Sequence, residues 1–232
     1  MSGKLSKTQI SAIIACVLLI VACIVYGIIV RFSYSRVSLD CSAYAKAKVC
    51  FEQEYAEYLD YNMESMDFET AKAILDDYNY IFKVKCKEIE HCYSCTKYIC
   101  SVLETVKGDP DESGKDIVLY QWNWFEWEKN GLSLYPTDDM LPMKDGMEYL
   151  VFAASKDYCA EYQQTLDKNE YSIGLNYVPT IYILNKTQTE PIDINNDTVY
   201  SSLDDKYYLC FSQEALNNVN KVAKQITDYY MD

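Results

Sequence analysis

The longest apolar run of the chain predicts a helix that is long enough to cross a lipid bilayer. Ile10–Val30 holds 21 residues without a charge, and lysines and arginines stand on both sides of it. At about 1.5 Å per residue, a helix of this length spans a hydrocarbon core of roughly 30 Å. We therefore expect residues 1–9 to form a short cytoplasmic tail and residues 10–30 to form a transmembrane anchor.

The same run favours an uncleaved signal-anchor, because it is longer than the apolar core of a cleaved signal peptide. Ile20–Cys23 resembles the lipobox of bacterial lipoproteins, in which the cysteine is acylated after cleavage. The residues after Cys23 are still apolar, where a lipoprotein turns polar, so the anchor is the preferred interpretation. Small residues near one helical face, among them Cys16 and Gly27, leave homo-oligomerisation through the membrane helix open.

Downstream of the anchor the pattern first predicts helices. Residues 41–62 contain neither glycine nor proline, so we expect a juxtamembrane helical stalk over residues 31–66. A second short helix is predicted over residues 69–78, near the start of a domain that covers residues 67–232. Apolar residues at helical spacing after Ser212 predict a C-terminal helix.

Between these helices the apolar period changes to two, which indicates half-buried strands. Apolar and charged residues alternate along Tyr80–Glu88, and similar runs follow at short intervals. The predicted strands cover residues 80–88, 98–106, 116–124, 148–155, 178–184 and 206–211. Short strands joined by turns are typical of a small barrel or sandwich. The expected fold is an N-terminal transmembrane helix followed by an α+β domain.

Cysteine usage bears on the side of the membrane that this domain occupies. An even set of cysteines in a modest domain suggests disulfides in an oxidising compartment. Eight of the ten cysteines lie outside the apolar run: Cys41, Cys50, Cys86, Cys92, Cys95, Cys100, Cys159 and Cys210. The cations after the anchor favour a cytoplasmic domain, but large domains behind an early anchor translocate largely regardless of charge. We therefore expect a single-pass cell-membrane protein with an extracytoplasmic, disulfide-bonded domain.

The densest group of reactive side chains lies between two of the predicted strands. The strands on either side of Tyr93 are nearly symmetric, so Cys86 and Cys100 are expected to face each other across a hairpin. Cys92 and Cys95 then close its turn. Two alternatives stay open: a zinc site made by His91, Cys92, Cys95 and one flanking cysteine, and a redox-active CxxC motif.

Charge narrows the classes of partner. Residues 37–232 hold 17 Lys and Arg against 35 Asp and Glu, which disfavours nucleic-acid binding and contact with anionic headgroups. All three tryptophans lie in one aromatic run: Trp122, Trp124 and Trp127. Trp122 and Trp124 share a strand face, which is typical either of a surface that stacks on a glycan or protein partner or of a core that aromatic rings close.

Catalysis finds little support in the sequence. The single histidine excludes most schemes in which a histidine activates a serine or cysteine nucleophile. No glycine-rich phosphate loop occurs, and no cofactor is expected. The chain is therefore expected not to be an enzyme.

Four consecutive motifs carry a resemblance to a known family. They read AKAILDDYNYIFKVKCKEI, YICSVLETVKGD, DIVLYQW and PMKDGMEYLVFAAS, and together they cover residues 71–155. This stretch resembles bacterial surface proteins with a netrin-like barrel, the OB barrel of tissue inhibitors of metalloproteinases. The resemblance implies a small OB-like antiparallel β-barrel with flanking helices. It does not imply protease inhibition, which in that family uses a free N-terminal cysteine.

The function expected from these features is a membrane-anchored extracytoplasmic binding or interaction module. One alternative is a thiol- or zinc-dependent redox protein or sensor that uses the segment from Cys86 to Cys100. Another is a structural subunit of a membrane complex, in which the tryptophans are buried against a partner.

Overall fold

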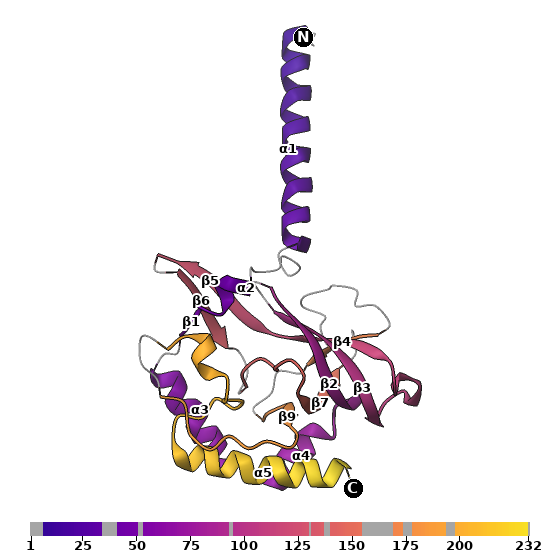
Figure 1. The fold of residues 1–232 in the computed structure, drawn as a ribbon. Helices are drawn as coiled ribbons and strands as arrows, with labels where there is room; N and C mark the ends of the chain where they lie inside the picture. The colour runs from indigo at the N-terminus through magenta and orange to yellow at the C-terminus, as the bar shows by residue number, and fades with distance from the viewer. Residues whose placement is uncertain are drawn as a thin grey trace. The chain divides into compact units, whose positions relative to one another are not determined.

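The computed structural model describes residues 7–33, 41–50, 53–92, 95–129, 131–136, 140–154, 169–173, 178–193 and 198–231. The chain divides into two units, residues 1–37 and residues 38–232, which have their own internal packing. Figure 1 shows the elements in chain order, from indigo to yellow.

The first unit contains a single described helix, α1 (Lys7–Ser33), which includes the whole apolar run Ile10–Val30. The predicted helix is thus confirmed. Its side chains are described from Ile13 to Gly27, and the large apolar ones in this stretch are 49% to 70% exposed. Among the described residues, no helix combines the length and the hydropathy needed to cross a membrane. A membrane-spanning role for α1 stays a prediction.

A closed five-stranded barrel is the centre of the second unit. Its strands are β2 (Tyr80–His91), β3 (Thr96–Lys107), β4 (Asp116–Gln121), β7 (Glu148–Ala154) and β8 (Glu170–Ile173). The ring runs β2-β3-β4-β8-β7 and back to β2, and every pair is antiparallel except β4–β8. This is an OB-like arrangement, which confirms the predicted small barrel within an α+β domain. A short strand, β9 (Ile181–Ile183), pairs with β7 outside the ring.

The barrel strands follow the alternation that the sequence shows. In β4, Ile117 and Leu119 are fully buried, whereas Val118 between them is half-buried. Strand β7 is apolar on both faces, because helix α5 (Gln213–Met231) packs on the side that the barrel interior does not fill. Phe152 of β7 meets Tyr230 of α5 edge-on, with ring centroids 5.1 Å apart. The predicted C-terminal helix is confirmed.

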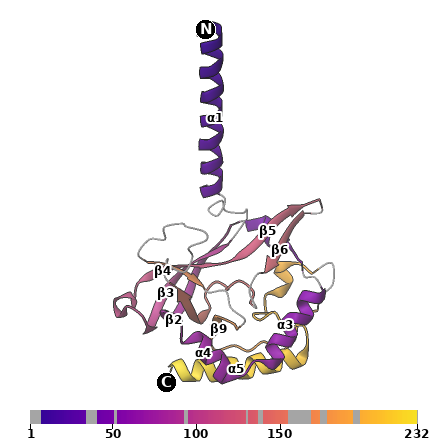
Figure 2. The ribbon, with the colours of Figure 1, turned by 180° about the vertical axis from the view of Figure 1, so that it is seen from behind.

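Two further helices lie beside α5. They are α3 (Gln53–Ser65) and α4 (Phe68–Leu75), and Figures 1 and 2 show both next to α5 from opposite viewpoints. The side chain of Asp67 accepts a hydrogen bond from the Thr70 backbone N–H at 2.9 Å and so caps the first turn of α4. The predicted helix at 69–78 is therefore present, but it begins one residue earlier, at Phe68, and ends three residues earlier, at Leu75.

A second, smaller sheet packs on a separate core. Its strands are β1 (Lys48–Val49), β5 (Asn123–Glu128) and β6 (Gly131–Pro136), in the order β1-β6-β5. Phe125, Leu134 and Leu59 are buried in this core. Three short helical elements complete the described chain: α2 (Cys41–Tyr44), η2 (Pro110–Glu112) and η4 (Tyr200–Leu203).

The continuous helix predicted over residues 41–62 is wrong. The segment contains α2, then β1, then the first part of α3. Val49 is buried, and the backbone N–H of Cys50 donates to Leu134 O at 3.0 Å, so the segment joins the small sheet. Pairing with β6 outweighs the helical preference of a stretch that lacks glycine and proline.

Three strand predictions need correction. The strand expected over 116–124 divides at Trp122, so that β4 joins the barrel and β5 joins the small sheet. The segment 206–211 contains only an isolated bridge between Tyr208 and Met140. The run 178–184 forms a strand only at β9, and strands β6 and β8 were not predicted.

Candidate functional site

The β2–β3 hairpin brings Cys86 and Cys100 together in the barrel interior. The two residues are register partners, and both side chains are fully buried. The Cys86 backbone N–H donates to Met147 O at 3.0 Å, and its carbonyl accepts from the Gly146 N–H at 2.9 Å. Both backbone groups therefore point away from β3. Cys86 and Cys100 form a non-hydrogen-bonded pair, the close pair of an antiparallel ladder, and this geometry suits a cross-strand disulfide.

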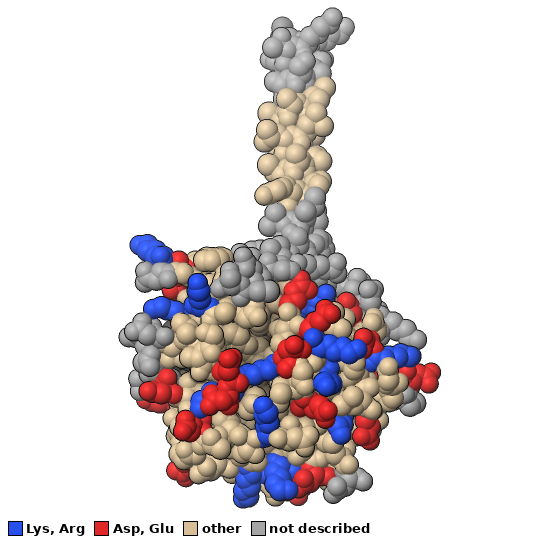
Figure 3. All heavy atoms as spheres, in the orientation of Figure 1, with Lys and Arg blue, Asp and Glu red and all other residues tan. Residues whose placement is uncertain are grey.

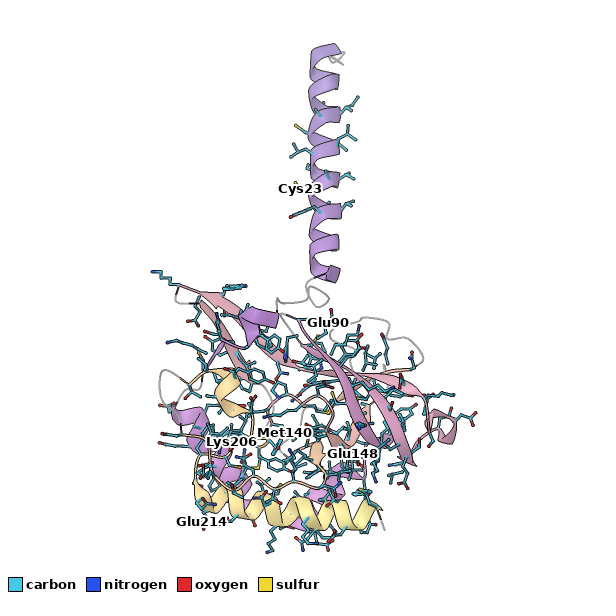
Figure 4. All side chains as sticks on the ribbon, viewed as in Figure 1. Cys23, Glu90, Met140, Glu148, Lys206 and Glu214 are labelled. Carbon is cyan, nitrogen blue, oxygen red and sulfur yellow. The ribbon has the colours of Figure 1, made fainter. Side chains whose placement is uncertain are left out.

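A second pair of cysteines lies at the end of the same hairpin. The Cys92 N–H donates to Cys95 O at 2.8 Å, and both side chains are buried. Contact between the two thiols lowers the pKa of Cys92 and raises the pKa of Cys95. Just before this pair, Glu90, which Figure 4 labels, forms an ion pair with Lys97 at 3.4 Å. The hairpin end is therefore held by backbone, thiol and charge contacts.

The remaining candidate cysteines lie outside this hairpin. Cys210 is buried and Cys50 is half-buried beside Tyr135. The side chain of Cys41 and the whole of Cys159 lie outside the described residues. Cys23 is exposed on α1 (Figure 4). No disulfide is present among the cysteines that the structure describes.

His91 is packed into aromatic rings. Its ring centroid lies 4.0 Å from that of Tyr44 and 5.4 Å from that of Phe125, and Nδ1 is 3.1 Å from Thr96 Oγ1. Burial lowers the pKa of the imidazole to about 4, so the ring is neutral near pH 7. Within the described part of the chain, no three His, Cys, Asp or Glu side chains converge to hold a metal. The zinc site predicted from His91, Cys92, Cys95 and a flanking cysteine therefore stays a prediction.

An aromatic stripe follows the outside of β4 and continues into β5. Val118, Tyr120 and Trp122 are half-buried, Trp124 is exposed, and the residues between them are buried. The Tyr120 hydroxyl donates to Glu170 Oε1 at 3.1 Å, and Trp122 Nε1 donates to Ser172 Oγ at 3.3 Å. Tyr120 and Trp122 are thus fixed against β8, whereas Trp124 on the small sheet is 48% exposed.

Trp124 has an aromatic neighbour that sequence reasoning did not identify. Tyr135 of β6 is its register partner, and the Tyr135 hydroxyl donates to the Glu128 carboxylate. The exposed carboxylate of Glu126 lies on the same face, two positions from Trp124. We call Trp124, Tyr135, Glu126 and Glu128 the hairpin face. The sequence signal for this face is the short apolar run of β6 that begins at Gly131. It was missed because the predicted strand ended at residue 124 and no hairpin was expected after it.

Trp127 does not belong to the hairpin face. It lies three positions from Trp124 in a strand without a register shift, so it points to the opposite side, where its register partner is Leu132. It is 55% exposed. The three tryptophans expected to face a ligand therefore occupy three environments: half-buried against β8, exposed on the hairpin face, and exposed on the reverse side.

No protein-family model matches this chain, and no curated protein matches it either.

Proposed function

We propose that the chain is a membrane-anchored, extracytoplasmic binding module that recognises its ligand through the hairpin face. The observation that carries this proposal is the exposure of Trp124, 48%, beside Tyr135 on a two-stranded hairpin. Large aromatic side chains are enriched at recognition surfaces, because they supply contact area at a low cost in conformational entropy.

The chemistry of the hairpin face favours a neutral glycan. An indole and a phenol offer flat surfaces on which the C–H face of a sugar ring stacks. The neighbouring carboxylates of Glu126 and Glu128 accept hydrogen bonds from sugar hydroxyls. The same carboxylates repel anionic sugars. A neutral oligosaccharide is therefore the proposed ligand, and a protein partner is the alternative outcome of the test.

The membrane anchor and the oxidising compartment are parts of the same proposal. Support for the anchor comes from the 27-residue helix α1, whose described large apolar side chains are 49% to 70% exposed. Support for the compartment comes from two cysteine pairs in one hairpin. The backbone geometry of Cys86–Cys100 suits a disulfide, and the thiols of Cys92 and Cys95 are in contact. The closed five-stranded ring supports a netrin-like barrel as the scaffold.

The test of recognition uses the full-length chain in neutral detergent, titrated with soluble neutral oligosaccharides from a glycan array. We expect Trp124→Ala and Tyr135→Ala each to weaken binding at least tenfold, since stacking area is lost. Trp127→Ala is the matched control, because this indole faces the other side of the hairpin. Absence of any glycan signal, or equal losses from Trp127→Ala and Trp124→Ala, would contradict the proposal.

The test of topology is protease treatment of intact cells that express the chain with a C-terminal epitope. An extracytoplasmic domain loses the epitope signal while a cytoplasmic marker stays intact. Protection of the epitope until the cells are lysed would place the domain inside and remove the basis for disulfides.

A further inference from the structure

A groove of ≈ 790 Å³ lies between the end of β9 and helix α5, away from the hairpin face. Five consecutive residues, 183–187, line one wall. A straight strand would present only alternate residues to it. The chain turns at Asn185, whose φ of 62° lies in the left-handed region. Asparagine tolerates this conformation better than most residues, and strained positions of this kind are concentrated at functional sites.

The groove is basic in a strongly acidic chain. Four lysines line it: Lys83, Lys186, Lys221 and Lys224. Asp228 is the one acidic residue in its described lining, and it pairs with Lys224 at 2.8 Å. The other three lysines form no ion pair within the described residues. Because the whole chain has a net charge of −14, three unpaired ammonium groups around one groove favour an anionic ligand.

The positive charges come from elements far apart in the sequence. Lys83 is on β2, Lys186 follows β9, and Lys221 is on α5. In Figure 3 lysines lie among acidic residues along the lower edge of the domain, where Figure 1 shows α5. Charges distributed in this way suit a ligand with several separated negative groups. A single small anion would contact only part of the set.

The length and the uncharged lining of the groove match a peptide. Its lining residues on α5 extend from Asn220 to Met231, which corresponds to roughly 16 Å of helix. About five residues of extended peptide cover that distance. Asn185, Thr187 and Asn220 offer polar groups, and Ile183, Leu184, Ala223 and Met231 offer apolar contact. We propose that this groove binds an extended acidic peptide segment of a partner protein.

The experiment measures binding of a fluorescein-labelled hexapeptide pool, with Asp or Glu at alternate positions, to the full-length chain in neutral detergent. A pool with Asn and Gln at those positions is the neutral probe. We expect the acidic pool to bind at least tenfold more tightly in 50 mM salt, and the difference to shrink in 300 mM salt. Equal binding of the two pools would overturn the proposal.

Three variants assign the binding to the groove. Lys186→Gln and Lys221→Gln should each weaken binding of the acidic pool about threefold, and the double variant about tenfold. Lys115→Gln is the control, because Lys115 is exposed and lies in the turn before β4. A loss with Lys115→Gln equal to that with Lys186→Gln would overturn the assignment. Unchanged thermal unfolding of all variants shows that the fold is intact.

A competition experiment separates a peptide from a small anion. Pyrophosphate is added at constant ionic strength to the complex with the acidic pool. We expect little displacement at 1 mM pyrophosphate. Full displacement, together with direct pyrophosphate binding that both lysine variants lose, would assign the groove to small anions and overturn the peptide proposal. None of these outcomes depends on glycan binding by the hairpin face.

Discussion

The Tyr98 hydroxyl donates a hydrogen bond to Gln121 Oε1 at 2.5 Å inside the closed barrel, where both side chains are fully buried. The same hydroxyl accepts from the backbone N–H of Met143 at 3.1 Å. Gln121 in turn donates to the carbonyl of Met140, the residue labelled in Figure 4, at 3.5 Å. One tyrosine oxygen thus links β3, β4 and the segment before β7.

Replacement of this tyrosine tests the link. Tyr98→Phe removes the oxygen and leaves both Gln121 Oε1 and the Met143 N–H without this partner in a buried site. We expect the free energy of unfolding in urea to fall by roughly 2–4 kcal/mol, since each buried group loses a hydrogen bond. Tyr61→Phe, at a position that is 68% exposed, should change it by less than about 0.5 kcal/mol. Equal effects of the two variants would contradict the described network.

Protonation of His91 opposes folding. The unfolded imidazole takes up a proton near pH 6.5, whereas burial lowers the folded pKa to about 4. The unfolded state therefore binds more protons between these two pH values. Protonation of His91 does not lower the free energy of unfolding above pH 6.5, and it lowers this free energy by roughly 3 kcal/mol as the pH falls to 4.

Because His91 is the single histidine, its imidazole proton resonance can be followed without assignment. We expect its chemical shift to change near pH 4 in the folded chain. The variant His91→Asn should lose the part of the acid sensitivity that lies between pH 6.5 and pH 5. A titration midpoint between pH 6 and 7 would show that the ring is solvated.

The two cysteine pairs predict a specific disulfide pattern. On oxidation each pair loses two protons and passes two electrons to the oxidant of the compartment, with bonds Cys86–Cys100 and Cys92–Cys95. Peptide mapping by mass spectrometry of the chain purified from membranes without reductant checks this pattern. We expect the double variant Cys86→Ser, Cys100→Ser to lower the unfolding free energy by roughly 3 kcal/mol, the value for a loop of about 15 residues.

A control keeps that measurement specific. In the presence of reductant, the unfolding free energies of the wild type and the double variant should differ by much less, because neither chain then has a bond between residues 86 and 100. Free titration of all thiols in the unreduced chain would contradict the disulfides and the oxidising compartment together.

Asn218 joins α5 to the end of α3. Its side-chain amide donates to three backbone carbonyls: Met63 O at 2.8 Å, Glu64 O at 3.2 Å and Met66 O at 2.7 Å. Carbonyls at a helix C-terminus have no partner within the helix. We expect Asn218→Ala to lower the unfolding free energy by about 1–3 kcal/mol.

The neighbouring residue provides the comparison. Asn217 is exposed and accepts a hydrogen bond only from Gln213 of its own helix, within the described contacts. Asn217→Ala should therefore be nearly neutral by urea unfolding. Alanine has a higher helix propensity than asparagine, so propensity alone would not lower stability. A loss that matches that of Asn218→Ala would therefore contradict the assignment of the Asn218 effect to its contact with α3.

Local patterns predicted the parts of the fold that depend on neighbours in the sequence. The alternation in Tyr80–Glu88 located β2, and the near symmetry around residue 93 placed Cys86 opposite Cys100, as the register shows. Helix α5 followed from its spacing of apolar residues. In each case one element already contains the full signal, because its buried face repeats with the period of the backbone.

The parts that were missed depend on partners elsewhere in the chain. Strand β1 has two residues, and its identity comes from pairing with β6, more than 80 positions away. Tyr135 reached the hairpin face only through the register of β5 with β6. The groove collects Lys83, Lys186 and Lys221 from three elements. No local periodicity in the sequence predicts such positions, because they are determined by pairing with distant segments of the chain.

The parallel pair β4–β8 has a consequence for the order of assembly. Every other pair in the ring is antiparallel, but Tyr120 and Glu170, which meet across β4 and β8, stand 50 positions apart. Contacts of this separation incur the entropy of closing a long loop before they contribute stability. Until β8 arrives, β4 has one edge with unpaired backbone groups, a surface prone to pairing with other chains. We therefore expect ring closure to come late in folding, since it also requires β2 to pair with β7, where Tyr80 meets Ala153.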